Sequence, residues 1–543
     1  MKLYGSSEMA HIDRMAIDIL GIPSSILMEN AGRATVNYIH HRLGPAQNCY
    51  APIFIGQGNN GGDGFVVGRH LLQHGCTPVF LIVATKEQLS ADSLLSFSII
   101  EKLGLPHLFV TCDIDTAYST LCKPYNRLKC YAIIDALFGV GLCRDITGLY
   151  ADAIALMNSI KAGTYLFSTT PPPLISCDIA SRIDANTGIG RGQWVKADYT
   201  ATYSYAKAGQ MQADGKEASG EIKILDIGIP TTLSQTVAPL FVAINEKFCA
   251  TTLHNSPRKN DSHKGSHGHI LIIGGTKGMA GAALLTGKAS LKMGSGLTTL
   301  AVPGALGVVF ESQLYEAMTI ALGTQEDNCL TTNHLQELKN AIDARDIIAI
   351  GPGLGTQEET ITTVQKIYQH STKPLVVDAD AINALAKSKE ILTNPKGPRI
   401  FTPHPGEMAR LLHTTISEIQ KNRKEAAQAF ISLFKNCDHE IVVVLKGEAS
   451  LVATTHSDTL YLNTSGNPGM ATGGMGDILT GIIASLLGQR LSYKDAAVVG
   501  TYIHGMAADH LAEISGVGFT ASEIATVLPL CRKKLQHVTR ITK

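Results

Sequence analysis

An apolar segment that runs into a glycine-rich segment is the feature that most limits the fold of this chain, because it occurs in both halves. At 51–55 a short apolar strand precedes G-Q-G-N-N-G-G-D-G at 56–64, and a helix is expected from 65 to 75. The same order of strand, glycine loop, helix and strand recurs at 268–302. Such units build open, mainly parallel sheets covered by helices, so the sequence predicts the α/β class.

The size and charge of the chain exclude several classes of protein. With 543 residues the chain is too long for one ordinary core, so at least two domains are expected. Lys plus Arg and Asp plus Glu number 46 each, which gives no support to nucleic acid or membrane partners. No secretory h-region is present, and the longest apolar run, 478–487, is too short for a bilayer. The eleven cysteines form no C-x-x-C pair, which is typical of a reducing cytoplasm.

The rest of the first half is expected to alternate between helices and strands. The spacing of apolar residues predicts two helices within 7–43, separated at Gly21-Ile22-Pro23. The polar stretch at 215–220 is typical of a hairpin turn. Further strands are expected at 131–137, 173–177, 199–205 and 222–225.

Polar residues stand where three of these strands end. Asn60, Asp135 and Asp178 each close or follow a buried strand. The carboxyl ends of parallel strands share one edge of a sheet, so these side chains are expected to converge. Their oxygen atoms suit a hard cation. Either aspartate alone would more often be a helix cap, and the glycine segment has neither the G-x-G-x-x-G spacing nor a Walker lysine. The three residues together therefore indicate a site.

Three motifs of the first half resemble the NAD(P)H-hydrate epimerase family: G-Q-G-N-N-G-G-D-G, D-A-L-F-G-V-G and C-D-I-A-S. The resemblance covers about residues 1–228 and implies a Rossmann-like domain in which Asp178 is the candidate for moving a proton. It also implies a potassium ion held by Asn60, Asp135 and Ser181. The implied contacts of the hydrated dinucleotide are Asn59, Asn60, Gly61, Gly62, Asp63, Gly139, Val140, Gly141, Leu142, Cys143, Arg144, Asp145 and Asp178.

The third motif departs from the family pattern. The family has D-I-P-S-G, whereas this chain has Ala180 in place of the proline and Arg182 in place of the glycine. The loop is therefore expected to be remodelled, although the aspartate and the serine remain. One alternative for this half is a domain that senses a dinucleotide without converting it.

The glycine-rich segment 466–481 is the main candidate site of the second half. It holds six glycines and one proline, and an apolar run follows Asp477. Its backbone N–H groups can converge on an anion at the start of a helix. A carboxylate there repels phosphate, so Asp477 is interpreted as a proton acceptor while the N–H groups stabilise phosphate charge. An ordinary glycine-rich turn is the alternative.

Two further polar residues of this half also follow strands. Lys446 comes after the strand expected at 441–445, and it could bind a phosphate or remain a surface cation. His404 stands between two prolines after the strand expected at 399–401. It could contact the ribose or nicotinamide group of a ligand, or have only a structural role.

The second half contains six further motifs: G-G-T-x-G-M-A-G-A-A, G-P-G-L-G, D-A-D-A, T-P-H-P-G-E, K-G-E-A-S and N-P-G-M-A-T-G-G-M-G-D. Together they resemble the ADP/ATP-dependent NAD(P)H-hydrate dehydratase family, which has a ribokinase-like fold. The resemblance implies that the hydrated dinucleotide faces Ala282, Gly353, Gly355, His404 and Asp477. It implies that the adenine nucleotide is bound by Lys446, Gly447, Glu448, Ala449, Ser450 and Gly476.

Together the two resemblances imply a bifunctional chain, with an epimerase domain at 1–228, a linker at 229–240 and a dehydratase domain at 241–543. The implied function is nicotinamide nucleotide repair. The R and S hydrates of NADH and NADPH would interconvert, and dehydration of the S hydrate would consume ADP, with Mg²⁺ as a cofactor, and release AMP and phosphate. The implied partners are these small molecules, in a cytoplasmic homo-oligomer. The alternative enzyme is a ribokinase-like kinase that phosphorylates a vitamin precursor and releases the ester.

Overall fold

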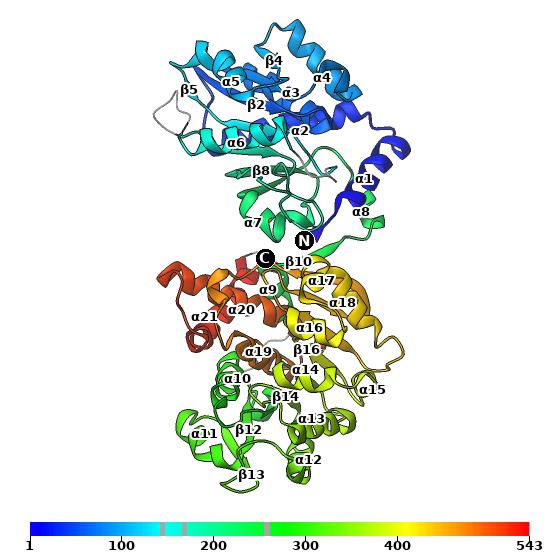
Figure 1. Cartoon of the computed structure of the whole chain (residues 1–543), viewed down its shortest axis with the longest axis vertical. Helices are drawn as coiled ribbons and strands as arrows, with labels where there is room; N and C mark the ends of the chain where they lie inside the picture. Colours follow the sequence, from blue (N-terminus) through cyan, green and yellow to red (C-terminus); the bar gives the residue numbers. More distant parts are fainter. Residues whose placement is uncertain (142–146, 165–170, 255–260, 542–543) are drawn as a thin grey trace. The chain divides into compact units, whose positions relative to one another are not determined.

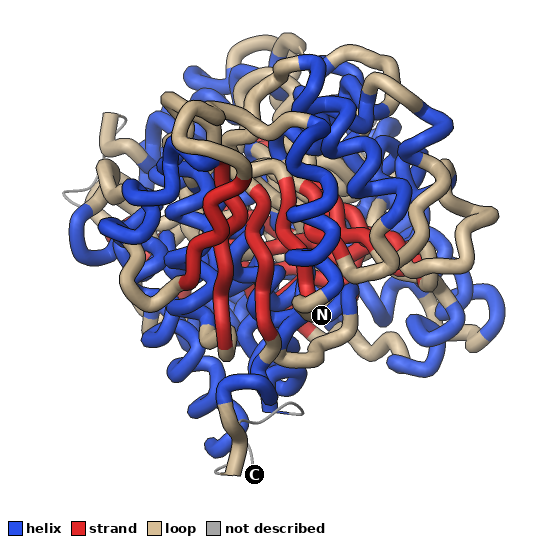
Figure 2. The backbone as a smooth tube through the Cα atoms, turned by 90° about the horizontal axis from the view of Figure 1, so that it is seen from below, coloured by secondary structure: helices blue, strands red, loops and turns tan. Residues whose placement is uncertain are grey.

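The chain divides into two compact α/β units. The computed structural model describes residues 1–141, 147–164, 171–254 and 261–541. One unit comprises residues 2–241, and the other comprises residue 1 with residues 242–543. In each unit helices cover a sheet, as the ribbon in Figure 1 shows, and Figure 2 draws the strands in red and the helices in blue. The predicted fold class is confirmed.

The first unit contains a parallel sheet in the order β4-β3-β2-β6-β7-β8-β9, with the short β5 beside β2. This order is the doubly wound order of Rossmann-like domains, in which the chain moves outward from a central strand in both directions. The strands are β2 (Cys49–Ile55), β3 (Cys76–Ile82), β4 (His107–Phe109), β5 (Lys129–Cys130), β6 (Ile133–Ala136), β7 (Leu174–Cys177), β8 (Tyr199–Tyr203) and β9 (Glu221–Leu225). The α-helices of the unit are α1 (Ser6–Arg14), α2 (Ser24–Leu43), α3 (Asn59–Gln73), α4 (Ala91–Lys102), α5 (Ile114–Cys122), α6 (Leu149–Lys161), α7 (Asp214–Ala218) and α8 (Thr231–Thr236).

The glycine-rich segment after β2 is mostly helical, so the expectation that the helix starts at 65 is wrong. Helix α3 begins at Asn59, and the first turns of α3 contain three glycines. A Cβ on Gly61 would meet the carbonyl oxygen of Gly56, and one on Gly64 would lie 2.6 Å from Cβ of Ala136. The glycines thus let α3 pack directly against the sheet. Local helix propensity does not predict this packing, because it depends on contacts with distant residues.

The hairpin expected at 215–220 is also wrong. Strands β8 and β9 pair in parallel, so the chain must cross over between them. The crossover contains the short helix α7, in which Gly215 is buried. The two glycines of this segment do not form a turn between paired strands. A Cβ on Gly215 would meet the carbonyl oxygen of Gly209, and Gly220 has a positive φ of 57°.

The second unit contains a sheet in the order β10-β19-β18-β17-β16-β15-β14-β11-β12-β13. The pairs of β18 with β17 and β19 are antiparallel, and the other pairs in this series are parallel. The strands are β10 (Phe241–Ile244), β11 (His269–Ile273), β12 (Leu297–Pro303), β13 (Met318–Leu322), β14 (Ile347–Ile350), β15 (Leu375–Val377), β16 (Arg399–Phe401), β17 (Ile441–Leu445), β18 (Leu451–Thr454) and β19 (Ser457–Asn463). The α-helices are α9 (Glu246–His254), α10 (Ala280–Met293), α11 (Gly307–Gln313), α12 (Leu335–Asp343), α13 (Glu358–His370), α14 (Ala379–Ala386), α15 (Lys389–Leu392), α16 (Pro405–Leu411), α17 (Ile416–Lys421), α18 (Arg423–Ser432), α19 (Met475–Gly488), α20 (Tyr493–Ser515) and α21 (Ala521–Ile541).

Helix α19 is the central helix of the second core. Its residues from 478 to 488 are all buried, and they join the core cluster that also includes α20 and α21. The apolar run 478–487 is therefore explained by burial on every side of a core helix. In the described parts of the chain, no helix has the length and hydropathy needed to span a membrane.

Candidate active sites

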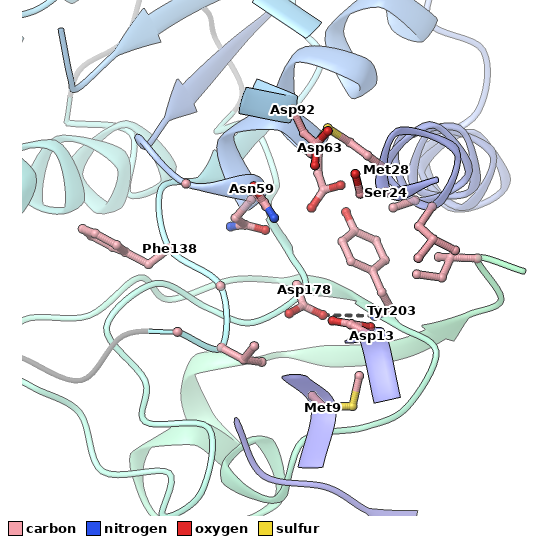
Figure 3. A pocket seen from close by; sticks show the side chains of 18 of the residues that line it. Met9, Asp13, Ser24, Met28, Asn59, Asp63, Asp92, Phe138, Asp178 and Tyr203 are labelled. Carbon is pink, nitrogen blue, oxygen red and sulfur yellow. Dashed lines mark hydrogen bonds between the residues drawn. The ribbon is translucent and has the colours of Figure 1, made fainter. Parts of the chain in front are cut away.

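The first unit has a cavity of about 680 Å³ at the carboxyl ends of its central strands. The segments that follow β2, β6 and β7 form one wall, and α1 and α2 form another. Figure 3 shows side chains from these elements directed into the same space. Its polar lining residues include Asp13, Ser24, Asn59, Asn60, Asp63, Asp92, Asp178, Tyr203 and Ser204.

Asp178 is fixed at the floor of this cavity by a buried ion pair. Its carboxylate accepts hydrogen bonds from the Nζ of Lys207 and from the backbone N–H of Tyr203 at 3.2 Å. Lys207 is 1% exposed and also donates to Thr202 Oγ1 at 2.9 Å. Asp178 has a φ of 65°, a strained conformation for a residue with a Cβ. A buried ion pair and local strain both cost stability, which favours a functional role.

Two more carboxyl groups of the cavity are shifted toward their neutral forms. Burial raises the pKa of Asp63 well above its ordinary value, and the charges of Asp178 and Asp13 raise it further. Burial also raises the pKa of Asp13 to about 6, again with a contribution from Asp178. The cavity therefore presents a neutral carboxyl group near an ion-paired carboxylate, which is the arrangement that acid–base catalysis requires.

The predicted potassium ligands lie at the ends of three neighbouring strands. Asp135 is fully buried, and its carboxylate accepts hydrogen bonds from Ser176 Oγ at 2.7 Å and Ser181 Oγ at 2.6 Å. Both polar atoms of the Asn60 side chain are buried without a hydrogen-bond partner among the described residues. An unpaired buried amide costs about 1–3 kcal/mol, so its oxygen is available to a ligand. These oxygen atoms fit a monovalent cation in chemical type.

The altered motif after β7 is buried and makes polar contacts in this structure. Arg182 has a φ of 74°, which is the left-handed conformation that the glycine of the family pattern adopts without strain. Its guanidinium group is buried and donates to the carbonyl oxygen of Gln193 at 3.0 Å. Ala180 is fully buried. With Ala180 and Arg182 in the loop, Ser181 donates to Asp135.

The structure places the other residues predicted for the first site in two ways. Asn59, Gly139, Val140 and Gly141 line the cavity. Gly61 and Gly62 are buried in α3 and do not line it. The remaining predicted contacts, Leu142, Cys143, Arg144 and Asp145, lie outside the residues that the structure describes.

In the second unit, Lys446 and Asp378 form an ion pair in the middle of the predicted site. Lys446 Nζ lies 2.8 Å from Asp378 Oδ1. Thr402 Oγ1 and Thr480 Oγ1 also donate to this carboxylate, at 2.8 and 2.9 Å. Burial alone would raise the pKa of Asp378, but the charge of Lys446 and these hydrogen bonds lower it. Asp378 therefore stays ionised and holds Lys446 at the end of β17.

Two neighbouring carboxyl groups have pKa values near neutrality. Burial and the charge of Asp378 raise the pKa of Asp477 to about 7, against the opposing effect of Lys446. Burial likewise raises the pKa of Glu407 to about 7. Asp477 lies in the first turn of α19. A carboxyl group with this pKa can accept a proton at neutral pH and release it again.

His404 caps helix α16 as a neutral imidazole. Its Nδ1 accepts a hydrogen bond from the backbone N–H of Gly406 at 3.0 Å, so the ring proton is assigned to Nε2. Burial and the charge of Lys446 lower the pKa of His404. Its Nε2 lies 3.4 Å from Glu407 Oε1, and the side chain as a whole is 51% exposed.

Two of the predicted nucleotide residues, Lys446 and Gly476, lie close together. A Cβ on Gly476 would lie 3.1 Å from Lys446 Nζ, so the absence of a side chain keeps space beside the cation. Arg423 of α18 holds the loop 446–449 by donating to the carbonyl oxygens of Leu445, Lys446 and Ala449 at 3.2, 3.3 and 3.2 Å. Burial lowers the pKa of Arg423 to about 10, so it remains charged at pH 7.

The predicted substrate residues of this unit come from two loops in contact. A Cβ on Gly353 would lie 3.0 Å from Cβ of Ala282, so the loop after β14 packs against the start of α10. The backbone N–H of Gly355 donates to Asp380 Oδ2 at 2.8 Å. Asp380 itself lies in the first turn of α14.

The sequence interpretation missed several polar residues of both sites. Asp378 and Glu407 lie in motifs that were recognised, and a buried strand ending in an acid was a usable signal for Asp378. Lys207, Asp13 and Arg423 had no local signal, because only the tertiary structure brings them to the sites.

Comparison with known proteins finds a separate family match for each unit. A family model described as YjeF-related protein N-terminus matches residues 24–209, and one described as NAD(P)H-hydrate dehydratase matches residues 270–530. The bifunctional NAD(P)H-hydrate repair enzyme Nnr of Moorella thermoacetica is 36% identical over 99% of this chain and 98% of its own length. The Escherichia coli protein of the same name is 33% identical over 95% of this chain and 91% of its own length.

Among solved structures, an ADP/ATP-dependent NAD(P)H-hydrate dehydratase from Bacillus subtilis, co-crystallised with ATP/Mg²⁺, is 31% identical. The matched region covers 54% of this chain and 99% of the Bacillus subtilis chain, with a TM-score of 0.46. Two α/β units, each with acidic and basic groups at the carboxyl ends of its strands, define a two-site α/β protein. The full-length similarity shows that the chain belongs to the family of bifunctional NAD(P)H-hydrate repair enzymes.

Proposed function

We propose that this chain repairs hydrated NADH and NADPH in two steps. The first unit interconverts the R and S hydrates, and the second unit dehydrates the S hydrate with ADP as phosphoryl donor, giving AMP and phosphate. The observation that carries the proposal is the position of Asp477 in the first turn of α19, near the cation Lys446. The pKa of Asp477 is about 7. A base and a phosphate-binding cation in one place suit phosphoryl transfer to a hydroxyl group.

In the first unit, the proposed chemistry is loss and return of water at C6 of the hydrated ring. Neutral Asp63 gives a proton to the C6 hydroxyl, and the C6–O bond breaks as water leaves. The lone pair of the adjacent ring nitrogen stabilises the cation. Water then adds to the opposite face of C6 and gives its proton to Asp178. The ion pair with Lys207 supports this assignment, because it fixes the orientation of the Asp178 carboxylate.

In the second unit, Asp477 takes the proton of the C6 hydroxyl. The oxygen attacks the terminal phosphorus of ADP, and the bond to AMP breaks. The C6–O bond then breaks as phosphate leaves, and transfer of a proton from C5 to the departing phosphate restores the double bond. Lys446 neutralises phosphate charge, because burial lowers its pKa but the charges of Asp378 and Glu407 raise it above the ordinary value. The backbone N–H groups around Gly476 contribute in the same way.

Two cations are part of the proposal. Asn60, Asp135 and Ser181 would hold potassium, and the unpaired Asn60 amide supports this set. Potassium would supply a fixed positive charge near the dinucleotide. In the described residues no group of three or more His, Cys, Asp or Glu side chains is placed to hold a metal. Mg²⁺ would therefore be held mainly by the ADP phosphates and water, where it would neutralise charge on the transferring phosphoryl group.

The variant Asp477→Asn tests the proposal. It should lower ADP-dependent dehydration at least about 100-fold, because the proton acceptor is lost, and leave epimerisation unchanged. The return of NADH absorbance and the release of AMP measure dehydration, and chromatography of the two hydrates measures epimerisation. Near-normal dehydration by the variant would refute the role of Asp477. A stable phosphate ester without NADH would instead indicate the small-molecule kinase.

A further inference from the structure

A second cavity lies beside the proposed dehydratase site. It has a volume of about 760 Å³, which is enough for a nucleotide-sized ligand. Two of its lining residues belong to the same loops as predicted substrate residues, because Thr356 follows Gly355 and Gly406 is two residues from His404. Asp380 links the two regions, since its carboxylate accepts hydrogen bonds from the N–H of Gly355 and from the Asn383 side chain.

The charges of this cavity are positive. Arg410 and Lys387 line it together with His413, and its lining residues, all from the described part of the chain, include no aspartate or glutamate. Arg410 donates one hydrogen bond to the amide oxygen of Asn383 at 2.9 Å, a neutral partner that fixes its guanidinium group without cancelling the charge. Lys387 lies 3.8 Å from Glu358 in an exposed ion pair, which is weak and exchangeable. Such a set of donors suits phosphate groups.

The other residues that line this cavity include apolar side chains and one residue with a strained backbone. Ile416 is 56% exposed at the cavity, and Ala386 and Ala409 also line it. An exposed aliphatic side chain beside cations offers a surface on which a purine base can pack. His413, in the turn between α16 and α17, has a φ of 52°, and strained residues of this kind often lie at ligand sites.

We propose that this cavity binds the adenosine half of the substrate dinucleotide, with Arg410 as the main contact to the phosphate on the adenosine side. The inference rests on the proposed dehydratase function. His404 and Asp477 hold the hydrated nicotinamide end, so the phosphates and the adenosine must extend away from them. Arg410 and Lys387 provide the positive charge that this extension requires, and Ile416 provides the apolar contact.

Kinetics with two substrates test the proposal. The full-length protein would be given the S hydrate of NADH and the corresponding hydrate of nicotinamide mononucleotide, which lacks the adenosine half. Arg410→Gln should raise KM for the dinucleotide hydrate about tenfold, with kcat unchanged, since one charged phosphate contact is lost. It should leave KM for the mononucleotide hydrate unchanged. Lys435→Gln removes an exposed cation elsewhere in the same unit and should alter neither constant.

Hydrogen–deuterium exchange separates this inference from the proposed function. ADP-ribose should slow exchange in residues 405–416 of the wild-type protein and not in Arg410→Gln. If Arg410→Gln affects both substrates equally, or neither, the cavity does not bind the adenosine half. If the wild-type protein restores no NADH, the dehydratase proposal fails, and protection of 405–416 by ADP-ribose alone still decides what the cavity binds.

Discussion

At the scale of single residues, the environment of Asp477 decides whether it can act as a base. A free aspartate is a weak proton acceptor at pH 7 because its pKa is near 4. Burial and the nearby charge of Asp378 raise the pKa of Asp477 to about 7, and Lys446 limits this rise. Burial acts in the same direction on Asp378, but the charge of Lys446 and the hydrogen bonds from Lys446, Thr402 and Thr480 lower the pKa of Asp378, so it stays ionised. The two aspartates therefore divide the roles of base and anchor.

This pKa predicts how dehydration depends on pH. The pKa of Asp477 is raised, so its carboxyl group is protonated below pH about 7 and cannot then accept a proton. We expect kcat/KM for dehydration to fall about tenfold for each pH unit below this value. Glu407 has a similar pKa, so a pH–rate profile of Glu407→Gln is the control. If the decline disappears in that variant, Glu407 and not Asp477 is the titrating group.

Arg399 shows how a residue outside the site stabilises the second unit. Its side chain is fully buried and donates to the carbonyl oxygens of Tyr368, Ser371, Lys373 and Pro398 at 2.7 to 3.0 Å. The guanidinium group also lies 4.9 Å from the ring of Tyr368. It therefore satisfies carbonyl groups at the end of α13 and in the segments before β15 and β16.

Replacing this residue by Arg399→Met should destabilise the second unit by about 3 kcal/mol, because buried carbonyl groups lose their donors. Urea unfolding followed by circular dichroism measures the change. Lys435→Met, on an exposed side chain, should change stability by less than about 0.5 kcal/mol. A small effect of Arg399→Met would mean that water replaces the guanidinium group.

At the scale of elements, both sites depend on helices that pack unusually close to their neighbours. Helix α3 lies against the sheet through Gly61 and Gly64, and α19 lies against α10 through Gly481. A Cβ on Gly481 would meet the carbonyl oxygen of Thr286 and lie 2.9 Å from Cβ of Ala289. Because the first turns of α3 and α19 carry Asn60 and Asp477, this packing also sets the positions of the site residues.

The variant Gly481→Ala should therefore separate α19 from α10. We expect a loss of about 1–3 kcal/mol in stability, as for other overpacked cores, together with lower dehydration. Epimerisation should be unaffected. Thermal unfolding and the two activity assays measure these effects, with the exposed α10 variant Lys292→Ala as the control. Normal stability of Gly481→Ala would show that the two helices can move apart without cost.

At the scale of the whole molecule, the two units supply consecutive steps on one substrate pool. Water adds to the nicotinamide ring without control of the face, so both hydrates form, and a second step that uses only the S hydrate leaves the R hydrate behind. Two separate compact units allow each step to be removed on its own. One chain also supplies both activities in a fixed ratio.

This arrangement predicts the behaviour of Asp178→Asn with a mixture of hydrates and excess ADP. The wild-type protein should convert the whole mixture to NADH. The variant should convert the S fraction at the normal rate and then slow to the spontaneous rate of epimerisation. The time course of NADH absorbance distinguishes the two, and pure S hydrate checks that the second unit is intact. Complete rapid conversion by the variant would exclude Asp178 from epimerisation.

The sequence by itself determined the α/β class, the strands that carry the sites, and most of the glycine-rich segments, because these follow from local periodicity and from short motifs. It also pointed to Asp178, His404, Lys446 and Asp477, since each directly follows a predicted strand or starts a helix. Local patterns predict secondary structure less well where a glycine allows two elements to pack closely. The segment from Asn59 to Gly64 was expected to be a loop, but contact with the sheet makes it helical.

The tertiary structure decided which charges meet. Lys207 reaches Asp178 from 29 residues away, Lys446 reaches Asp378 from 68, and Arg423 reaches the loop after β17 from 23. Burial then shifts the pKa values of Asp63, Glu407 and Asp477. Neither effect has a local signature, because the free energy of a buried charge depends on which groups the fold places around it.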